Sequence, residues 1–129
     1  MGKDKESFSI GARIRSFSYA LAGVRELLKS QHNAWIHLLA TAVVTGAGLF
    51  FGVHRLEWAL LIMAMTIVWT AEALNTALEF TCDAASPDFH PLVKKAKDVA
   101  AGAVLLASIG AAALGVLVFY PYIEVWFDF

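Results

Sequence analysis

The stretch AEALNTALEFTCD, residues 71–83, closes a long apolar run of the chain. The run is long enough to cross a bilayer as a helix, so Glu72 falls inside or at the edge of the hydrocarbon. A carboxylate at that depth costs a few kcal/mol at least. Glu72, Asn75 and Glu79 are spaced three and four apart, which places their side chains on one helix face. Asp83 extends this face, so the sequence predicts a polar stripe that starts within the membrane and runs out towards water.

Polar residues inside a membrane also have a structural explanation, because they can hold neighbouring helices together through hydrogen bonds. A single Asn75 would fit that explanation. Two glutamates on the same stripe are harder to account for, since each charge needs a partner or water. We therefore interpret the stripe as part of a functional site.

Composition indicates an integral membrane protein with an all-α fold. The chain has 129 residues, of which 59% are hydrophobic and only 16% charged, and its mean hydropathy is +0.64. A soluble domain of this size needs more polar surface. One cysteine, Cys82, excludes an internal disulfide. A net charge of −1 gives no reason to expect a nucleic-acid partner.

Hydrophobic periodicity predicts four helices within a single domain that covers residues 1–129. Residues 8–30 carry apolar side chains at alternating spacings of four and three, with basic residues mostly off that face. This pattern is typical of an amphipathic helix that lies in the membrane interface, and packing on the other helices as a lid is compatible with it. Three apolar runs, residues 34–51, 58–82 and 97–120, are expected to span the membrane.

The distribution of positive charge predicts the topology. Apart from Arg55, every Lys and Arg lies in the N-terminal segment or in the loop around Lys94. The positive-inside rule then places the N-terminus and this loop in the cytoplasm and the C-terminus on the outer side. The acidic stripe descends towards the cytoplasm, where it can meet Lys97 and Asp98 of the third span.

Phosphoryl transfer from a nucleotide would use such a set of groups. A divalent metal on the phosphates needs hard oxygen ligands, which Glu79 can supply, and Lys97 can neutralise phosphate charge. Glu72, held in apolar surroundings, is a candidate base for an alcohol, and its depth suits a hydroxyl carried by a lipid. The sequence has no glycine-rich loop of the Walker type, so a nucleotide site would be unconventional.

These motifs resemble the prokaryotic diacylglycerol kinase family, which includes the undecaprenol kinases. The resemblance covers nearly the whole chain, from the amphipathic helix to the third span. It implies a homotrimeric kinase of the bacterial inner membrane that uses ATP and Mg²⁺ to phosphorylate a membrane lipid. The residues that carry it are Glu72, Asn75, Glu79, Asp83, His90, Ala96, Lys97 and Asp98.

The resemblance also implies roles for individual residues. Glu72 would be the catalytic base, Glu79 would bind metal and ATP, and Asn75 and Asp83 would support the site. An arginine of the surface helix would also contact ATP, and the choice between Arg13 and Arg15 stays open. The remaining expected ATP contacts are Tyr19, Asp88, Phe89, His90, Lys97 and Asp98.

One position departs from the family pattern. The family has a second metal-binding glutamate after the surface helix, where this chain has Gln31. An amide oxygen can coordinate a metal but brings no charge, so affinity would be weaker unless Glu26 or a different geometry compensates. Trp35 likewise replaces the family's usual basic residue. Residues 33–37 and 85–92 look closer to the undecaprenol kinase branch than to the diacylglycerol kinases.

Two other functions remain open on the sequence. The chain could be a catalytically weakened family member that acts as a lipid-binding membrane subunit, in which the change at Gln31 has removed the chemistry. It could also be a small transporter with Glu72 as the translocating carboxylate. The outer halves of the spans are almost wholly apolar, which argues against a polar path across the membrane.

Overall fold

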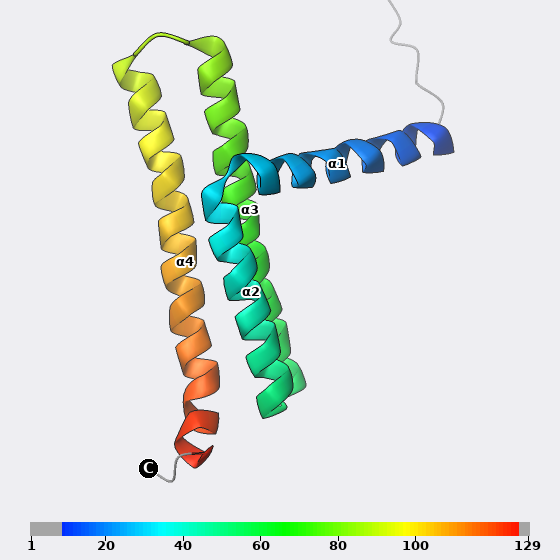
Figure 1. Cartoon of the computed structure of the whole chain (residues 1–129), viewed down its shortest axis with the longest axis vertical. Helices are drawn as coiled ribbons and strands as arrows, with labels where there is room; N and C mark the ends of the chain where they lie inside the picture. Colours follow the sequence, from blue (N-terminus) through cyan, green and yellow to red (C-terminus); the bar gives the residue numbers. More distant parts are fainter. Residues whose placement is uncertain (1–8, 127–129) are drawn as a thin grey trace, which may run out of the picture.

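The computed structural model describes residues 9–126, and within them every regular element is a helix. The helices are α1 (Ile10–Ser30), α2 (His32–Phe51), α3 (Arg55–Ala85) and α4 (Pro91–Trp126). Helices α2, α3 and α4 lie side by side, and α1 projects sideways from them (Figure 1). The predicted all-α membrane fold with one surface helix and three spanning helices is confirmed. Residue 8, the first of the expected surface helix, lies outside the described residues.

The surface helix α1 exposes its apolar stripe. Ser9 caps its start by accepting a hydrogen bond from the Ala12 N–H. Ile14, Phe17 and Leu21 are all exposed, which suits a helix whose apolar face lies in the membrane interface. At its end the backbone of Gln31 turns to an extended conformation, with φ −114° and ψ 119°. The chain therefore changes direction at Gln31 before α2 begins.

Helices α2 and α3 are joined by a tight turn and approach each other closely. Gly52 ends α2 in the left-handed conformation, with φ 65°, which glycine adopts without strain. His54 and Glu57 then form a capping box at the start of α3. The Trp58 ring packs on Gly48, where a Cβ atom would lie 2.7 Å from the ring. This contact fixes how the two helices face each other near the turn.

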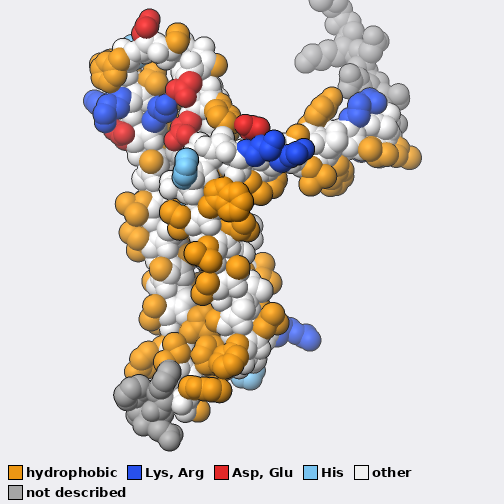
Figure 2. All heavy atoms as spheres, in the orientation of Figure 1, with side chains coloured by type: hydrophobic (Ala, Val, Ile, Leu, Met, Phe, Trp, Pro, Cys, Tyr) orange, Lys and Arg blue, Asp and Glu red, His pale blue; other side chains and the backbone are white. Residues whose placement is uncertain are grey.

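Helices α3 and α4 form a long antiparallel hairpin (Figure 1). They have 31 and 36 residues, and so exceed the predicted spans 58–82 and 97–120 at both ends. At about 1.5 Å per residue, α3 is roughly 46 Å long, against about 30 Å of hydrocarbon. The hairpin tip therefore projects past the level of α1, and the acidic and basic side chains gather around it (Figure 2).

The rest of the surface is that of a membrane protein. All three long helices are apolar enough to cross a bilayer. Most of their large apolar side chains are exposed, and the core formed within one chain is small. It lies at the end of the bundle away from α1, where Val53, Leu61 and Val118 are buried together. The apolar faces of α2, α3 and α4 are thus left for lipid or for other protein chains.

Candidate active site

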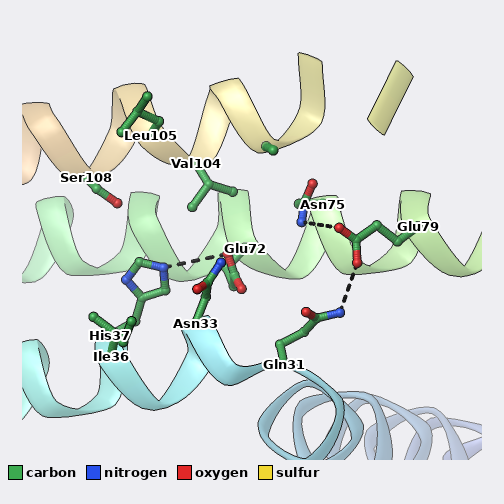
Figure 3. Close-up of a pocket in the computed structure, with 11 residues that line it drawn as sticks. Gln31, Asn33, Ile36, His37, Glu72, Asn75, Glu79, Val104, Leu105 and Ser108 are labelled. Carbon is green, nitrogen blue, oxygen red and sulfur yellow. Dashed lines mark hydrogen bonds and ion pairs between the residues drawn. The ribbon is translucent and has the colours of Figure 1, made fainter. Parts of the chain in front are cut away.

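Glu72 lines a pocket between α2, α3 and α4 (Figure 3). Its side chain is 1% exposed, although the surrounding helix surfaces are largely open. Asn75, one turn further along α3, is also buried. The pocket has a volume of about 260 Å³. Its lining residues are Gln31, Asn33, Ile36, His37, Glu72, Asn75, Glu79, Ala101, Val104, Leu105 and Ser108.

The pocket lining includes a polar cluster of three residues, Gln31, Asn75 and Glu79. The Gln31 Nε2 donates a hydrogen bond to Glu79 Oε2 at 3.0 Å. The Asn75 Nδ2 donates to the other carboxylate oxygen, Oε1, at 3.2 Å. The chain turn at Gln31 brings its amide over α3, so both amides converge on one carboxylate (Figure 3). The Oδ1 atom of Asn75 is buried with no hydrogen-bond partner among residues 9–126.

The carboxylate of Glu72 differs from that of Glu79 because it accepts no hydrogen bond. Within the described residues, both of its oxygens are buried without a donor. His37 of α2 lies beside it, with its Nε2 atom 3.6 Å from Glu72 Oε2. Figure 3 shows His37 and Asn33 on the side of α2 that faces Glu72. A buried carboxylate without partners is costly, which indicates that its pocket is built to take a polar ligand.

Above the pocket, an ion pair joins the two arms of the hairpin. The Lys97 Nζ lies 2.7 Å from Asp83 Oδ1, linking α4 to the end of the acidic stripe on α3. Asp98 instead pairs with Lys94 on its own helix, at 2.6 Å. Lys97 therefore lies near the acidic stripe, whereas Asp98 points to a neighbouring exposed cation.

The other expected ATP contacts lie away from the pocket in a single chain. Asp88, Phe89 and His90 are exposed in the connection between α3 and α4. Tyr19 is 72% exposed on α1, and the two candidate arginines, at positions 13 and 15, are exposed on the same helix. None of these residues lines the pocket around Glu72.

Three polar residues of the pocket were not predicted as site residues: Asn33, His37 and Ser108. The sequence contains a signal for the first two. Polar side chains recur at Asn33, His37 and Thr41, each four residues after the last, within an otherwise apolar run. That spacing puts them on one face of α2. Ser108 stands alone among small residues of α4 and has no comparable signal.

Comparison with known proteins decides the family. Residues 18–119 match the family model described as prokaryotic diacylglycerol kinase. The chain belongs to this family. The predicted resemblance is thereby confirmed, and so is the predicted lipid kinase activity. Kinase chemistry in this family implies ATP as the co-substrate and a lipid as the acceptor.

Relatives with two different names match most of the chain. The undecaprenol kinase of Bacillus subtilis (strain 168) is 34% identical over 107 residues, which cover 83% of this chain and 87% of that protein. The diacylglycerol kinase of Synechocystis sp. (strain ATCC 27184 / PCC 6803 / Kazusa) is 43% identical over 110 residues, or 82% of this chain but only 61% of that protein. The diacylglycerol kinase of Pseudomonas aeruginosa is 31% identical over 94 residues, covering 73% of this chain and 76% of that protein.

Proposed function

We propose that this lipid kinase transfers the γ-phosphate of ATP to the hydroxyl of a membrane lipid, with Glu72 as the base. The observation that carries the proposal is a buried carboxylate that has no hydrogen-bond donor among residues 9–126, in a pocket that also contains the Gln31–Asn75–Glu79 cluster. Glu72 accepts the hydroxyl proton as the lipid oxygen attacks the γ-phosphorus, and ADP leaves. Glu79 lies about 10 Å further along α3, which leaves room for the phosphates between the two carboxylates.

The polar cluster fits a divalent metal shared with the nucleotide. Mg²⁺ binds hard oxygens and is usually held by one or two carboxylates together with substrate phosphates and water. Glu79 offers such a carboxylate, and the partnerless Asn75 Oδ1 beside it is a suitable neutral ligand. Among residues 9–126, no three His, Cys, Asp or Glu side chains are grouped as a metal site. This fits an ion held mainly through the phosphates, whose charge Mg²⁺ would neutralise.

Gln31 takes part in this cluster through its amide. With its Nε2 on Glu79 it holds the carboxylate in place, and a rotation of the amide would turn Oε1 towards a metal instead. Lys97, which pairs with Asp83, would supply positive charge to the phosphate oxygens. We assign the expected ATP contacts Tyr19, Asp88, Phe89, His90 and Asp98 to the outer parts of the nucleotide, since they lie away from Glu72.

For the lipid, we propose undecaprenol. The B. subtilis relative carries the name undecaprenol kinase and is matched over 87% of its length. Residues 33–37, which look closer to that branch, include the two polar side chains of α2 that face Glu72. The pocket is continued along the membrane by an apolar groove of about 480 Å³, which shares His37 and Ser108 with it and could take one hydrocarbon chain.

The substrate can be tested by phosphate transfer from labelled ATP in mixed micelles that offer undecaprenol and a diacylglycerol in parallel. We expect label in undecaprenyl phosphate at a kcat/KM at least about tenfold higher than for the diacylglycerol, a difference of about 1.4 kcal/mol. Label mainly in phosphatidic acid would make diacylglycerol the substrate. Label in neither lipid, with folded protein and excess Mg²⁺, would contradict the proposed reaction. Glu72→Gln protein prepared in the same way is the control for contaminating kinases.

We propose a homotrimer, as the family resemblance implies. The large exposed apolar faces of α2 to α4 support an assembly, because a single chain buries few of its apolar side chains. The mass of the detergent-solubilised protein by native mass spectrometry should correspond to three copies. A monomeric mass in a detergent that preserves turnover would contradict this.

We propose that the protein lies in the inner membrane with its N-terminus in the cytoplasm and its C-terminus outside. The support is the gathering of charged side chains at the hairpin tip, on the α1 side of the bundle (Figure 2). In intact cells, a cysteine introduced at Glu124 should react with a membrane-impermeant thiol reagent, whereas native Cys82 should react only after lysis. The reverse labelling pattern would contradict the orientation.

A further inference from the structure

His37 lies beside the buried Glu72, and the reaction proposed above gives this histidine no role. The side chain of His37 is 13% exposed and that of Glu72 is 1% exposed. The His37 Nε2 and both carboxylate oxygens lack any hydrogen-bond partner among the described residues. Their separation of 3.6 Å is slightly longer than a hydrogen bond. Catalytic hydrogen bonds are often long in the absence of substrate and shorten when it binds.

The His37 ring is held in place from both helices. The edge of the ring meets Trp69 of α3, with ring centroids 6.1 Å apart and an interplanar angle of 68°. The Trp69 Nε1 in turn donates a hydrogen bond to Thr41 Oγ1 at 3.0 Å, on the next turn of α2. Trp69 precedes Glu72 by one turn of α3. The same two helices that carry the pair therefore also fix the ring's orientation.

His37 lies where the polar pocket meets the apolar groove. It is one of two residues, with Ser108, that line both the polar pocket and the apolar groove. A lipid whose chain lies in the apolar groove must bring its hydroxyl past His37 to reach Glu72. A hydrogen-bond donor at this point can hold Glu72 Oε2, the carboxylate oxygen near His37, while Oε1 stays available to the lipid.

We propose that His37 is a positioning residue for the lipid phosphorylation, which it serves by donating its Nε2–H to Glu72 Oε2. The inference rests on the proposed role of Glu72 as the base. In this role the imidazole donates its Nε2–H and keeps that proton throughout the reaction. Glu72 Oε1 receives the proton of the lipid hydroxyl as the new oxygen–phosphorus bond forms and the bond to ADP breaks. The hydrogen bond to Oε2 keeps Oε1 directed at the hydroxyl, and orientation at this level is worth about 10²-fold in rate.

Two substitutions at His37 separate donation from packing. In His37→Gln, the amide N–H lies close to the position of Nε2, whereas His37→Met has a similar length and no donor. We expect His37→Met to lower kcat by about 10- to 100-fold, with KM for ATP and for the lipid unchanged within about threefold. His37→Gln should keep kcat within about fivefold of the wild type. Turnover is measured on the full chain in mixed micelles with undecaprenol.

A matched control and a stability measurement complete the test. His54→Met makes the same change at the outer end of the bundle, where His54 caps α3, and should leave kcat unchanged. Equal kcat for His37→Met and the wild type would overturn the proposal. Equal losses of kcat in His37→Gln and His37→Met would also overturn it, because they would mean that the side chain acts through packing alone. A rise in KM at constant kcat in His37→Met would overturn it as well. If the wild type itself phosphorylates no lipid, the proposed function fails first, and this proposal fails with it.

Discussion

Glu72→Gln is expected to lower kcat for lipid phosphorylation by about 10²- to 10⁴-fold, the usual contribution of a general base. The amide has the same shape as the carboxylate but cannot accept the hydroxyl proton at neutral pH. The substitution removes a buried charge whose oxygens accept no hydrogen bond from residues 9–126. The variant should therefore assemble and unfold at a temperature no lower than that of the wild type. Incorporation of labelled phosphate into lipid measures the loss.

The control for this experiment is Glu57→Gln, the same chemical change at the opposite end of α3. Glu57 accepts a hydrogen bond from Tyr122 Oη at 2.5 Å and one from the His54 N–H at 2.7 Å. Neutralising it should weaken this link between the helices and lower the unfolding temperature without changing kcat. Near-normal turnover in Glu72→Gln would exclude Glu72 as the base, and the lipid hydroxyl would then need another proton acceptor.

The polar stripe of α3 shows which part of the site could be predicted from the sequence. Helix spacing is a local property, so the alignment of Glu72, Asn75 and Glu79 on one face follows from their positions three and four apart. Burial depth follows from the length of the apolar run. The structure keeps this face together, since all three residues line one pocket (Figure 3).

The partner of Glu72 could not be predicted in the same way. Whether His37 faces α3 depends on the rotation of α2 about its own axis, which no spacing within α2 determines. In the structure that rotation accompanies two contacts between helices: the Trp58 ring on Gly48 and the Trp69 hydrogen bond to Thr41. The spacing of Asn33, His37 and Thr41 puts them on one face of α2, but only the packing of the helices shows what that face meets.

The residues expected to bind ATP show a second limit of prediction from the sequence. Tyr19 and the segment 88–90 were grouped with Glu79 because of the family resemblance, which says nothing about their distance from it in one chain. In the structure α1 projects from the bundle and the hairpin tip extends beyond it (Figure 1). The apolar runs also say little about where the helices end, because they report hydrocarbon thickness, while α3 and α4 continue as helices among charged residues.

Glu79→Gln is the second substitution with a large expected effect. The cluster of Gln31, Asn75 and Glu79 contains a single carboxylate, so this change leaves three neutral amides. A site without charge holds Mg²⁺ weakly, and we expect kcat/KM for ATP at fixed Mg²⁺ to fall by at least about 100-fold. Raising the Mg²⁺ concentration should recover part of the loss. A loss that does not respond to Mg²⁺ would contradict the assignment of Glu79 to the metal.

The contact between Gln31 and Glu79 allows a charge exchange that tests the same assignment. Gln31→Glu alone places two carboxylates about 3 Å apart, which repel each other unless a cation lies between them. This variant should bind Mg²⁺ more tightly than the wild type and should unfold at a lower temperature when Mg²⁺ is removed. Unchanged Mg²⁺ affinity would mean that Gln31 does not face the metal.

The double variant Gln31→Glu/Glu79→Gln returns one carboxylate to the cluster from the opposite side. If the total charge on the cluster governs metal binding, the kcat/KM of the double variant for ATP should be about tenfold higher than that of Glu79→Gln. If it stays as inactive as Glu79→Gln while Gln31→Glu alone binds Mg²⁺ more tightly, the carboxylate must lie on α3 itself. Position would then matter more than charge, because only α3 holds its carboxylate in fixed register with Glu72, about two helical turns away.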